Sequence, residues 1–112
     1  MKFNLRNYNF DFSKNERKIL VTFMKQLLKQ VSGNQKLFAE EKAFTSILDK
    51  LNSDDETVKF TKDEFTRLRY NLELNLKFLK EQSTKGWFWK KWLYKSMITQ
   101  YSLIYDTHFK NQ

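Results

Sequence analysis

The chain has 112 residues, a formal net charge of +8 at pH 7, and neither cysteine nor proline. A chain of this length predicts a single helical domain that spans residues 1–112. Hydrophobic residues make up 40% of the chain and aromatic residues 17%, which is too much apolar side chain for a disordered protein. The lack of cysteine excludes disulfides and thiol chemistry, and the lack of proline favours long helices over a turn-rich β-fold.

The positive charge is concentrated at the two ends of the sequence. Residues 1–30 and 83–112 carry net charges of +5 and +4, whereas residues 31–57 carry −3. This balance favours an anionic partner, such as nucleic acid, an anionic membrane surface or an acidic protein face, and solubility alone is the alternative. No apolar run of about 18 residues predicts a transmembrane helix, and residues 1–6 lack the apolar run of a signal peptide. Together with the lack of cysteine, this favours a cytoplasmic location.

Residues 1–12 form an extended leader in which apolar and polar side chains alternate. A shorter copy of this alternation occurs at residues 58–60. We expect residues 8–12 and 58–60 to pair as a short β-bridge. Two strands alone are marginal in water, so the helices would have to support this bridge.

A motif occurs at the end of each extended segment, 48 residues apart in the chain: FSKNE begins at Phe12 and FTKDE begins at Phe60. In both copies a hydroxyl residue precedes a glutamate by three positions, which is the pattern of a capping box at a helix N-terminus. Over the 18 residues that start at each phenylalanine, six positions are identical. This internal repeat predicts two helical hairpins, and the alternative is a chance likeness between two amphipathic helices.

Apolar residues at three- and four-residue spacing predict four helices, at about residues 13–31, 35–51, 61–82 and 87–109. Gly33 suits the left-handed position that ends the first helix, and residues 83–86 (STKG) are expected to break the third. Leu74 and Phe78 are expected to widen the buried face of the third helix. Because short connections favour antiparallel neighbours, the predicted fold class is all-α, a four-helix bundle built as two helical hairpins.

The last predicted helix begins with the most unusual segment of the chain. Residues 86–95 (GWFWKKWLYK) hold all three tryptophans and three lysines. At about 100° per residue, one broad side of this helix gathers Leu93, Tyr94, Met97, Ile98, Tyr101, Ile104 and Tyr105. The opposite side carries a second set, which we name the aromatic–lysine face: Phe88, Lys91, Trp92, Lys95, Thr99 and Leu103. One hairpin partner can cover only one of these two sides.

Three interpretations of this two-sided pattern stay open. The helix could be buried on both sides, as large aromatic residues often are. The aromatic–lysine face could instead bind a protein partner or a second copy of the chain, because aromatic anchors dominate interface energetics. It could also bind an anionic membrane surface or single-stranded nucleic acid through its lysines and rings. We favour a non-enzymatic module that acts by binding a protein through this face.

No pattern in the sequence indicates a catalytic site, a metal site or a cofactor. His108 is the only histidine, and no second base or ligand accompanies it, so a structural role is expected. Residues 54–56 (DDE) lack the alternating oxygen ligands and central glycine of a calcium loop. Gly33 and Gly86 stand alone, so no glycine-rich phosphate loop is present.

In size, basic charge and predicted helical hairpins, the chain is similar to small bacteriocin immunity proteins. The similarity lies in these general features and not in a shared motif. It implies an immunity-type function as a further alternative to general protein binding.

Overall fold

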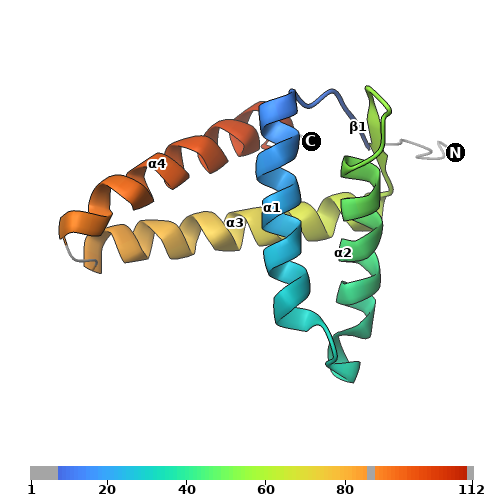
Figure 1. The fold of residues 1–112 in the computed structure, drawn as a ribbon, viewed down its shortest axis with the longest axis horizontal. Coiled ribbons are helices and arrows are strands. Elements are labelled where there is room, and N and C mark those ends of the chain that lie inside the picture. The colour runs from blue at the N-terminus through green and yellow to red at the C-terminus, as the bar shows by residue number, and fades with distance from the viewer. Residues whose placement is uncertain (1–7, 86–87, 111–112) are drawn as a thin grey trace, which may run out of the picture. The chain divides into compact units, whose positions relative to one another are not determined.

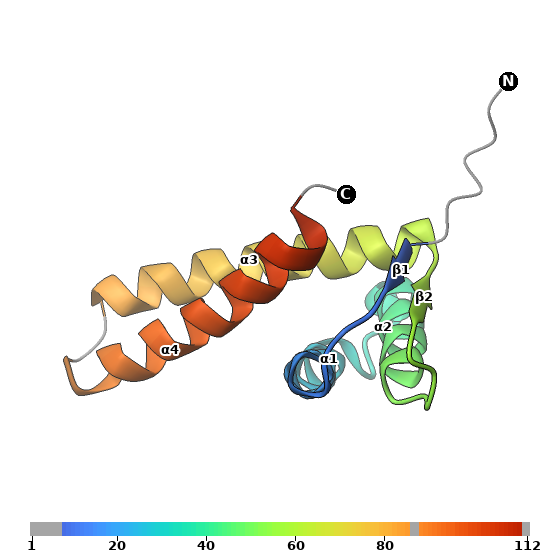
Figure 2. The ribbon, with the colours of Figure 1, turned by 90° about the horizontal axis from the view of Figure 1, so that it is seen from above.

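The structure, a computed structural model, describes residues 8–85 and 88–110, without the side chains of residues 88–90. Within these residues it contains four α-helices and one two-stranded antiparallel sheet (Figures 1 and 2). The predicted all-α class, with helical hairpins and a short β-bridge, is confirmed. The chain divides into two compact units, residues 1–67 and 68–112, which are described in turn. The single domain expected from the length stays a prediction.

The first unit begins with strand β1 (Tyr8–Phe10) and helix α1 (Lys14–Val31). The predicted capping box is present, because Ser13 Oγ accepts from the Glu16 N–H at 3.1 Å and Glu16 Oε1 accepts from the Ser13 N–H at 2.8 Å. Gly33 follows the helix with a φ of +81°, the left-handed conformation expected at this position. Both ends of α1 are therefore encoded by local sequence.

Helix α2 (Phe38–Leu51) runs beside α1 in both Figure 1 and Figure 2. A single 3₁₀ turn, η1 (Gln35–Leu37), precedes it, so the α-helix begins three residues later than predicted. Asn34 Oδ1 accepts from the Lys36 N–H at 3.0 Å, which caps this tighter turn. The apolar stripes of the two helices are buried: Leu20, Phe23, Met24, Leu27, Val31, Ala43, Phe44, Ile47 and Leu51.

Strand β2 (Val58–Phe60) pairs antiparallel with β1, and Phe10 lies opposite Val58. The predicted β-bridge is therefore present, although β1 ends at Phe10 and does not extend to residue 12. Aromatic packing supports the bridge. The ring of Phe10 lies 5.3 Å from that of Phe12, 5.7 Å from that of Phe60 and 5.8 Å from that of Phe65, between centroids. These side chains supply the burial that two isolated strands lack.

Helix α3 (Lys62–Lys85) starts with the second capping box, in which Thr61 replaces the serine. The glutamate of this box, Glu64, is only 6% exposed and has further partners on α2. Lys50 Nζ donates to its Oε1 at 2.6 Å, and the Ser46 hydroxyl donates to its other oxygen. Burial raises the pKa of the Glu64 carboxyl, but the hydrogen bonds from Lys50, Ser46 and the Thr61 N–H outweigh burial and hold that pKa below its ordinary value.

Arg17 of α1 organises the loop between α2 and β2. Its guanidinium donates to the carbonyl oxygens of Leu51 and Ser53, each at 3.2 Å, and to that of Glu56 at 3.0 Å. It also donates to the carbonyl of Asp55. A planar group with several fixed donors can satisfy carbonyls from successive parts of a turn, which a lysine cannot do in the same way.

In the second unit, α3 continues to Lys85, three residues beyond its predicted end. Of the residues 83–86 that were expected to break the helix, residues 83–85 continue it, so that part of the prediction is wrong, and Gly86 lies outside the described residues. Ser83 Oγ donates to the Lys80 carbonyl at 2.8 Å and Thr84 Oγ1 donates to the Glu81 carbonyl at 2.7 Å. Hydroxyl groups that bond back to the preceding turn are compatible with a continuing helix.

Helix α4 (Phe88–Ile104) runs antiparallel beside α3 (Figures 1 and 2) and ends in a π-helical turn, η2 (Tyr105–Phe109). The Lys110 N–H donates to the Tyr105 carbonyl at 2.9 Å, which is the five-residue spacing of a π-turn. Each residue of such a turn rotates less about the axis, so Phe109 returns to the buried side of the helix and is 0% exposed. Among the helices of the described residues, none is both long enough and apolar enough to cross a membrane.

We expect Arg17→Lys to loosen the loop between α2 and β2, because it keeps the charge but removes the guanidinium fork. The free energy of unfolding should fall by about 1–3 kcal/mol. Backbone ¹⁵N relaxation should show increased mobility at residues 53–57. Lys18→Ala, a change at the exposed neighbouring lysine, is the control and should leave both measurements unchanged. An equally ordered loop in the Arg17→Lys protein would contradict this role.

The lowered pKa of Glu64 predicts a loss of stability in acid. Because its folded-state pKa lies below the ordinary value of 4.5, the carboxylate stabilises the fold above pH 4.5, and this contribution disappears as the pH falls through the lowered pKa. Glu64→Gln should cost about 1–3 kcal/mol near pH 7 and should flatten the acid limb of stability, measured by urea unfolding from pH 2 to 7. Glu16→Gln is the matched control, since it alters the more exposed capping box. Equal losses in the two variants would rule out a special role for Glu64.

Candidate functional site

The aromatic–lysine face lies on α4. Five of its six residues have described side chains, and all five are exposed: Lys91, Trp92, Lys95, Thr99 and Leu103. The side chain of the sixth, Phe88, lies outside the described residues. Trp92 is 70% exposed and Leu103 is 64% exposed. These values disfavour the interpretation in which α4 is buried on both sides.

Helix geometry aligns the exposed residues along one strip of α4. Trp92 and Leu103 are eleven positions apart, which is about 16 Å along the axis. Lys95 and Thr99 lie between them, and the four residues fall within an arc of about 80° at 100° per residue. The Thr99 hydroxyl donates to the Lys95 carbonyl at 2.9 Å, so its hydrogen is used within the helix. The strip therefore offers an apolar anchor at each end and the exposed ammonium group of Lys95 between them.

The opposite side of α4 is its buried side. Tyr101 is 6% exposed and Ile104 is 1% exposed. Burial raises the pKa of the Tyr101 hydroxyl. Leu93, which the helical projection placed on this side, is 43% exposed and adds to the accessible apolar surface of α4.

A polar contact joins the C-terminal end of this helical segment to α3. The Tyr105 hydroxyl donates to the Glu73 carboxylate, and Arg69 Nε lies 3.5 Å from the same Glu73 oxygen. Arg69 Nη2 also donates to the Lys110 carbonyl at 3.5 Å. The hydrogen bond to Glu73, together with burial, raises the pKa of Tyr105, although Arg69 opposes this shift. The phenol therefore stays protonated near neutral pH and can donate the hydrogen bond to Glu73 that joins this segment to α3.

The electrostatics of α4 differ from those of the other helices. The first turns of α1, α2 and α3 contain acidic residues, which complement the positive end of the helix dipole. The first turn of α4 contains none, and exposed Lys91 and Lys95 lie in its N-terminal half. A lysine in the first turn of a helix is unfavourable, and this effect falls off within that turn, so it concerns Lys91 and not Lys95. This end of the aromatic–lysine face is strongly positive.

A second set of exposed apolar residues lies on α3 and was missed by the sequence analysis. Tyr70 is 59% exposed, Leu74 is 45% exposed and Phe78 is 54% exposed. The prediction that Leu74 and Phe78 widen the buried face is wrong. Each lies two positions from a buried leucine, which places it about 160° around the helix. A position-by-position comparison of the two repeats would have predicted this exposure, because α1 has the polar residues Thr22, Gln26 and Gln30 at the corresponding positions.

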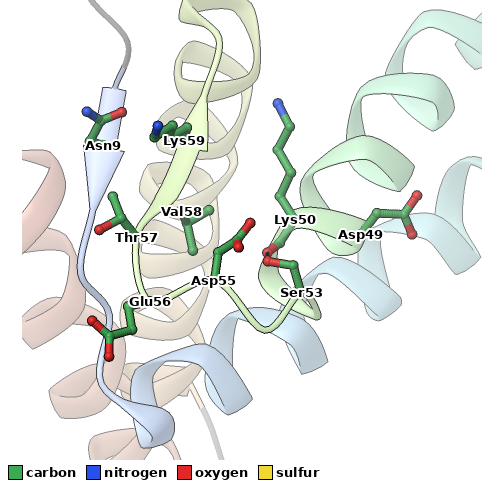
Figure 3. Close-up of a pocket in the computed structure, with 9 residues that line it drawn as sticks. All are labelled: Asn9, Asp49, Lys50, Ser53, Asp55, Glu56, Thr57, Val58 and Lys59. Carbon is green, nitrogen blue, oxygen red and sulfur yellow. Dashed lines mark hydrogen bonds between the residues drawn. The ribbon is translucent and has the colours of Figure 1, made fainter.

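The acidic loop between α2 and β2 borders an open hollow (Figure 3). Asp55 and Glu56 belong to the loop and Asp49 to the last turns of α2, and their carboxylates point in different directions in Figure 3. Over residues 8–85 and 88–110, no group of three or more acidic or histidine side chains is placed to hold a metal ion.

Comparisons with protein-family models, with curated proteins and with solved structures found no match for this chain.

Proposed function

We propose that this chain is a non-enzymatic, cytoplasmic helical module that binds a protein partner through the aromatic–lysine face of α4. The observation that carries the proposal is the exposure of Trp92, at 70%. Tryptophan is among the residues that most often dominate binding energy at interfaces, and a monomer gains nothing from leaving one in water.

The free energy available at Trp92 is large for a single side chain. A tryptophan buries on the order of 200 Å² when it is fully covered. Covering the exposed part of such a side chain would contribute roughly 3–4 kcal/mol at 25 cal/mol per Å². Leu103, at the other end of the strip, adds a second apolar anchor. Two anchors about 16 Å apart match a partner with two apolar pockets, or a partner helix laid along α4.

Charge specifies one end of the proposed partner. Lys91 and Lys95 lie beside Trp92 in a helical half that has no acidic residue. An acidic rim on the partner, next to the pocket for Trp92, would be complementary to the charge of these lysines. The proposed partner is therefore apolar at the centre of its binding site and acidic at one edge.

Trp92→Ala should weaken partner binding and leave the fold intact. Because the side chain is exposed, we expect the free energy of unfolding to change by less than about 1 kcal/mol. Capture of the partner should fall by about 30-fold or more, as at an interface hot spot. The measurement is a quantitative pull-down from the source cell with immobilised intact protein and the Trp92→Ala variant, together with thermal unfolding of both.

Phe38→Ala is the matched control, because Phe38 is an aromatic residue of α2 that is 65% exposed. It should capture the same proteins as the intact chain. A Trp92→Ala protein that captures them equally well, or that loses several kcal/mol of stability, would overturn the proposal. Titration with a single-stranded oligonucleotide and with anionic vesicles, each at two salt concentrations, completes the test. Tight, salt-sensitive binding to either, lost in Trp92→Ala, would assign the face to an anionic polymer or membrane instead.

A further inference from the structure

We propose that the exposed apolar stripe of α3, formed by Tyr70, Leu74 and Phe78, is the interface of a homodimer in which two α3 helices pair antiparallel. The proposed two-fold axis passes at Leu74. This surface lies on a different helix from the aromatic–lysine face, and the inference is independent of the proposed function.

The stripe is continuous and regular. Its three residues follow at intervals of four, so they lie one above another along α3, and their exposed fractions are 59%, 45% and 54%. They span about 12 Å of the helix axis. Single exposed hydrophobic residues are ordinary on protein surfaces, but three large ones in a row on one helix are typical of an interaction surface.

The internal repeat provides a comparison for each position of the stripe. With the offset of 48 residues, Tyr70, Leu74 and Phe78 of α3 correspond to Thr22, Gln26 and Gln30 of α1. All six residues are exposed, so the two helices point the same positions outward. α1 fills these positions with polar side chains, as an exposed helical face normally does. The apolar side chains of α3 are therefore not required by the helical repeat itself.

The second copy of the chain fits the stripe because the stripe is symmetric about its centre. An antiparallel pair with its two-fold axis at Leu74 places Leu74 against Leu74, and each Tyr70 against Phe78 of the other copy. Two apolar residues of similar size at equal distances from the centre satisfy a self-complementary interface. Interaxial distances of about 8–10 Å are normal for such helix pairs.

Charge on one flank of the stripe is also self-complementary. Glu73 and Lys77 lie on the same side of the stripe, and both are exposed. In an antiparallel pair the same flanks of the two helices meet, as they do in antiparallel coiled coils. Glu73 then lies about 3 Å along the axis from Lys77 of the second copy, and the reverse pair forms on the other side of the two-fold axis. The two Glu73 side chains lie equally close to each other along the axis, so the two Glu73–Lys77 pairs have to offset this like-charge contact. The Glu73 charge is also partly neutralised within its own chain, where Tyr105 donates to it and Arg69 lies beside it.

Cysteine crosslinking tests both the interface and its register. The chain has no cysteine, so Leu74→Cys, Tyr70→Cys and Phe78→Cys each carry one thiol. Under mild oxidation at low protein concentration, Leu74→Cys should form a covalent dimer, because the two-fold axis places residue 74 of one chain against residue 74 of the other. Tyr70→Cys alone and Phe78→Cys alone should stay monomeric on a non-reducing gel, but an equimolar mixture should give the heterodimer. Phe38→Cys, exposed on α2, measures random collision.

Two results of the crosslinking would overturn the proposal. One is crosslinking of Leu74→Cys no faster than that of Phe38→Cys. The other is self-crosslinking of Tyr70→Cys as fast as that of Leu74→Cys, which would indicate parallel helices and not antiparallel ones.

A variant that copies α1 onto α3 tests the interface without cysteine. Tyr70→Thr, Leu74→Gln and Phe78→Gln together give α3 the residues of the corresponding positions of α1. Sedimentation at two concentrations should show a concentration-dependent dimer for the intact chain and a monomer of unchanged helical content for this variant. Trp92→Ala should remain dimeric. A monomeric intact chain, a dimeric triple variant, or a monomeric Trp92→Ala protein would each contradict an interface on α3.

Discussion

The first unit depends on a single buried carboxylate. Glu64 accepts from the Thr61 N–H and so completes the first turn of α3, while Lys50 and Ser46 of α2 donate to the same group. A carboxylate that is 6% exposed would be costly without these partners. The cap of one helix is thereby also the contact to another, and β2, which immediately precedes the cap, is held beside both.

The second unit carries most of the accessible apolar surface. Of the seven large hydrophobic residues that are exposed within the described part of the chain, six lie between Tyr70 and Leu103, on α3 and α4. A pair of helices has room for only a thin core, so apolar residues on its outer faces contribute little to folding of the isolated chain. Partners that cover these faces would stabilise the unit by mass action.

Local signals made much of the fold predictable from the sequence. Both capping boxes, the left-handed Gly33 and the pairing of the two extended segments follow from residue types at short spacing. The π-turn at residues 105–109 does not, because it depends on the burial of Phe109. The exposure of Leu74 was missed although the sequence contains it, because the repeat places Leu74 at the position of the polar residue Gln26 of α1. Trp92 could be placed on a face but not shown to be exposed, because periodicity shows which apolar residues share a face but not which face is covered.

The repeat indicates how one helical pattern can serve two purposes. α1 and α3 share the cap, the entering phenylalanine and the buried leucines at Leu20 and Leu68, all of which determine folding. They differ at three outward positions, where α1 has the polar residues Thr22, Gln26 and Gln30 and α3 has Tyr70, Leu74 and Phe78. A substitution at an outward position changes the surface and leaves the core as it was. A binding surface is therefore expected on the second repeat, α3, where apolar residues occupy exposed positions at which polar residues would be favoured in water.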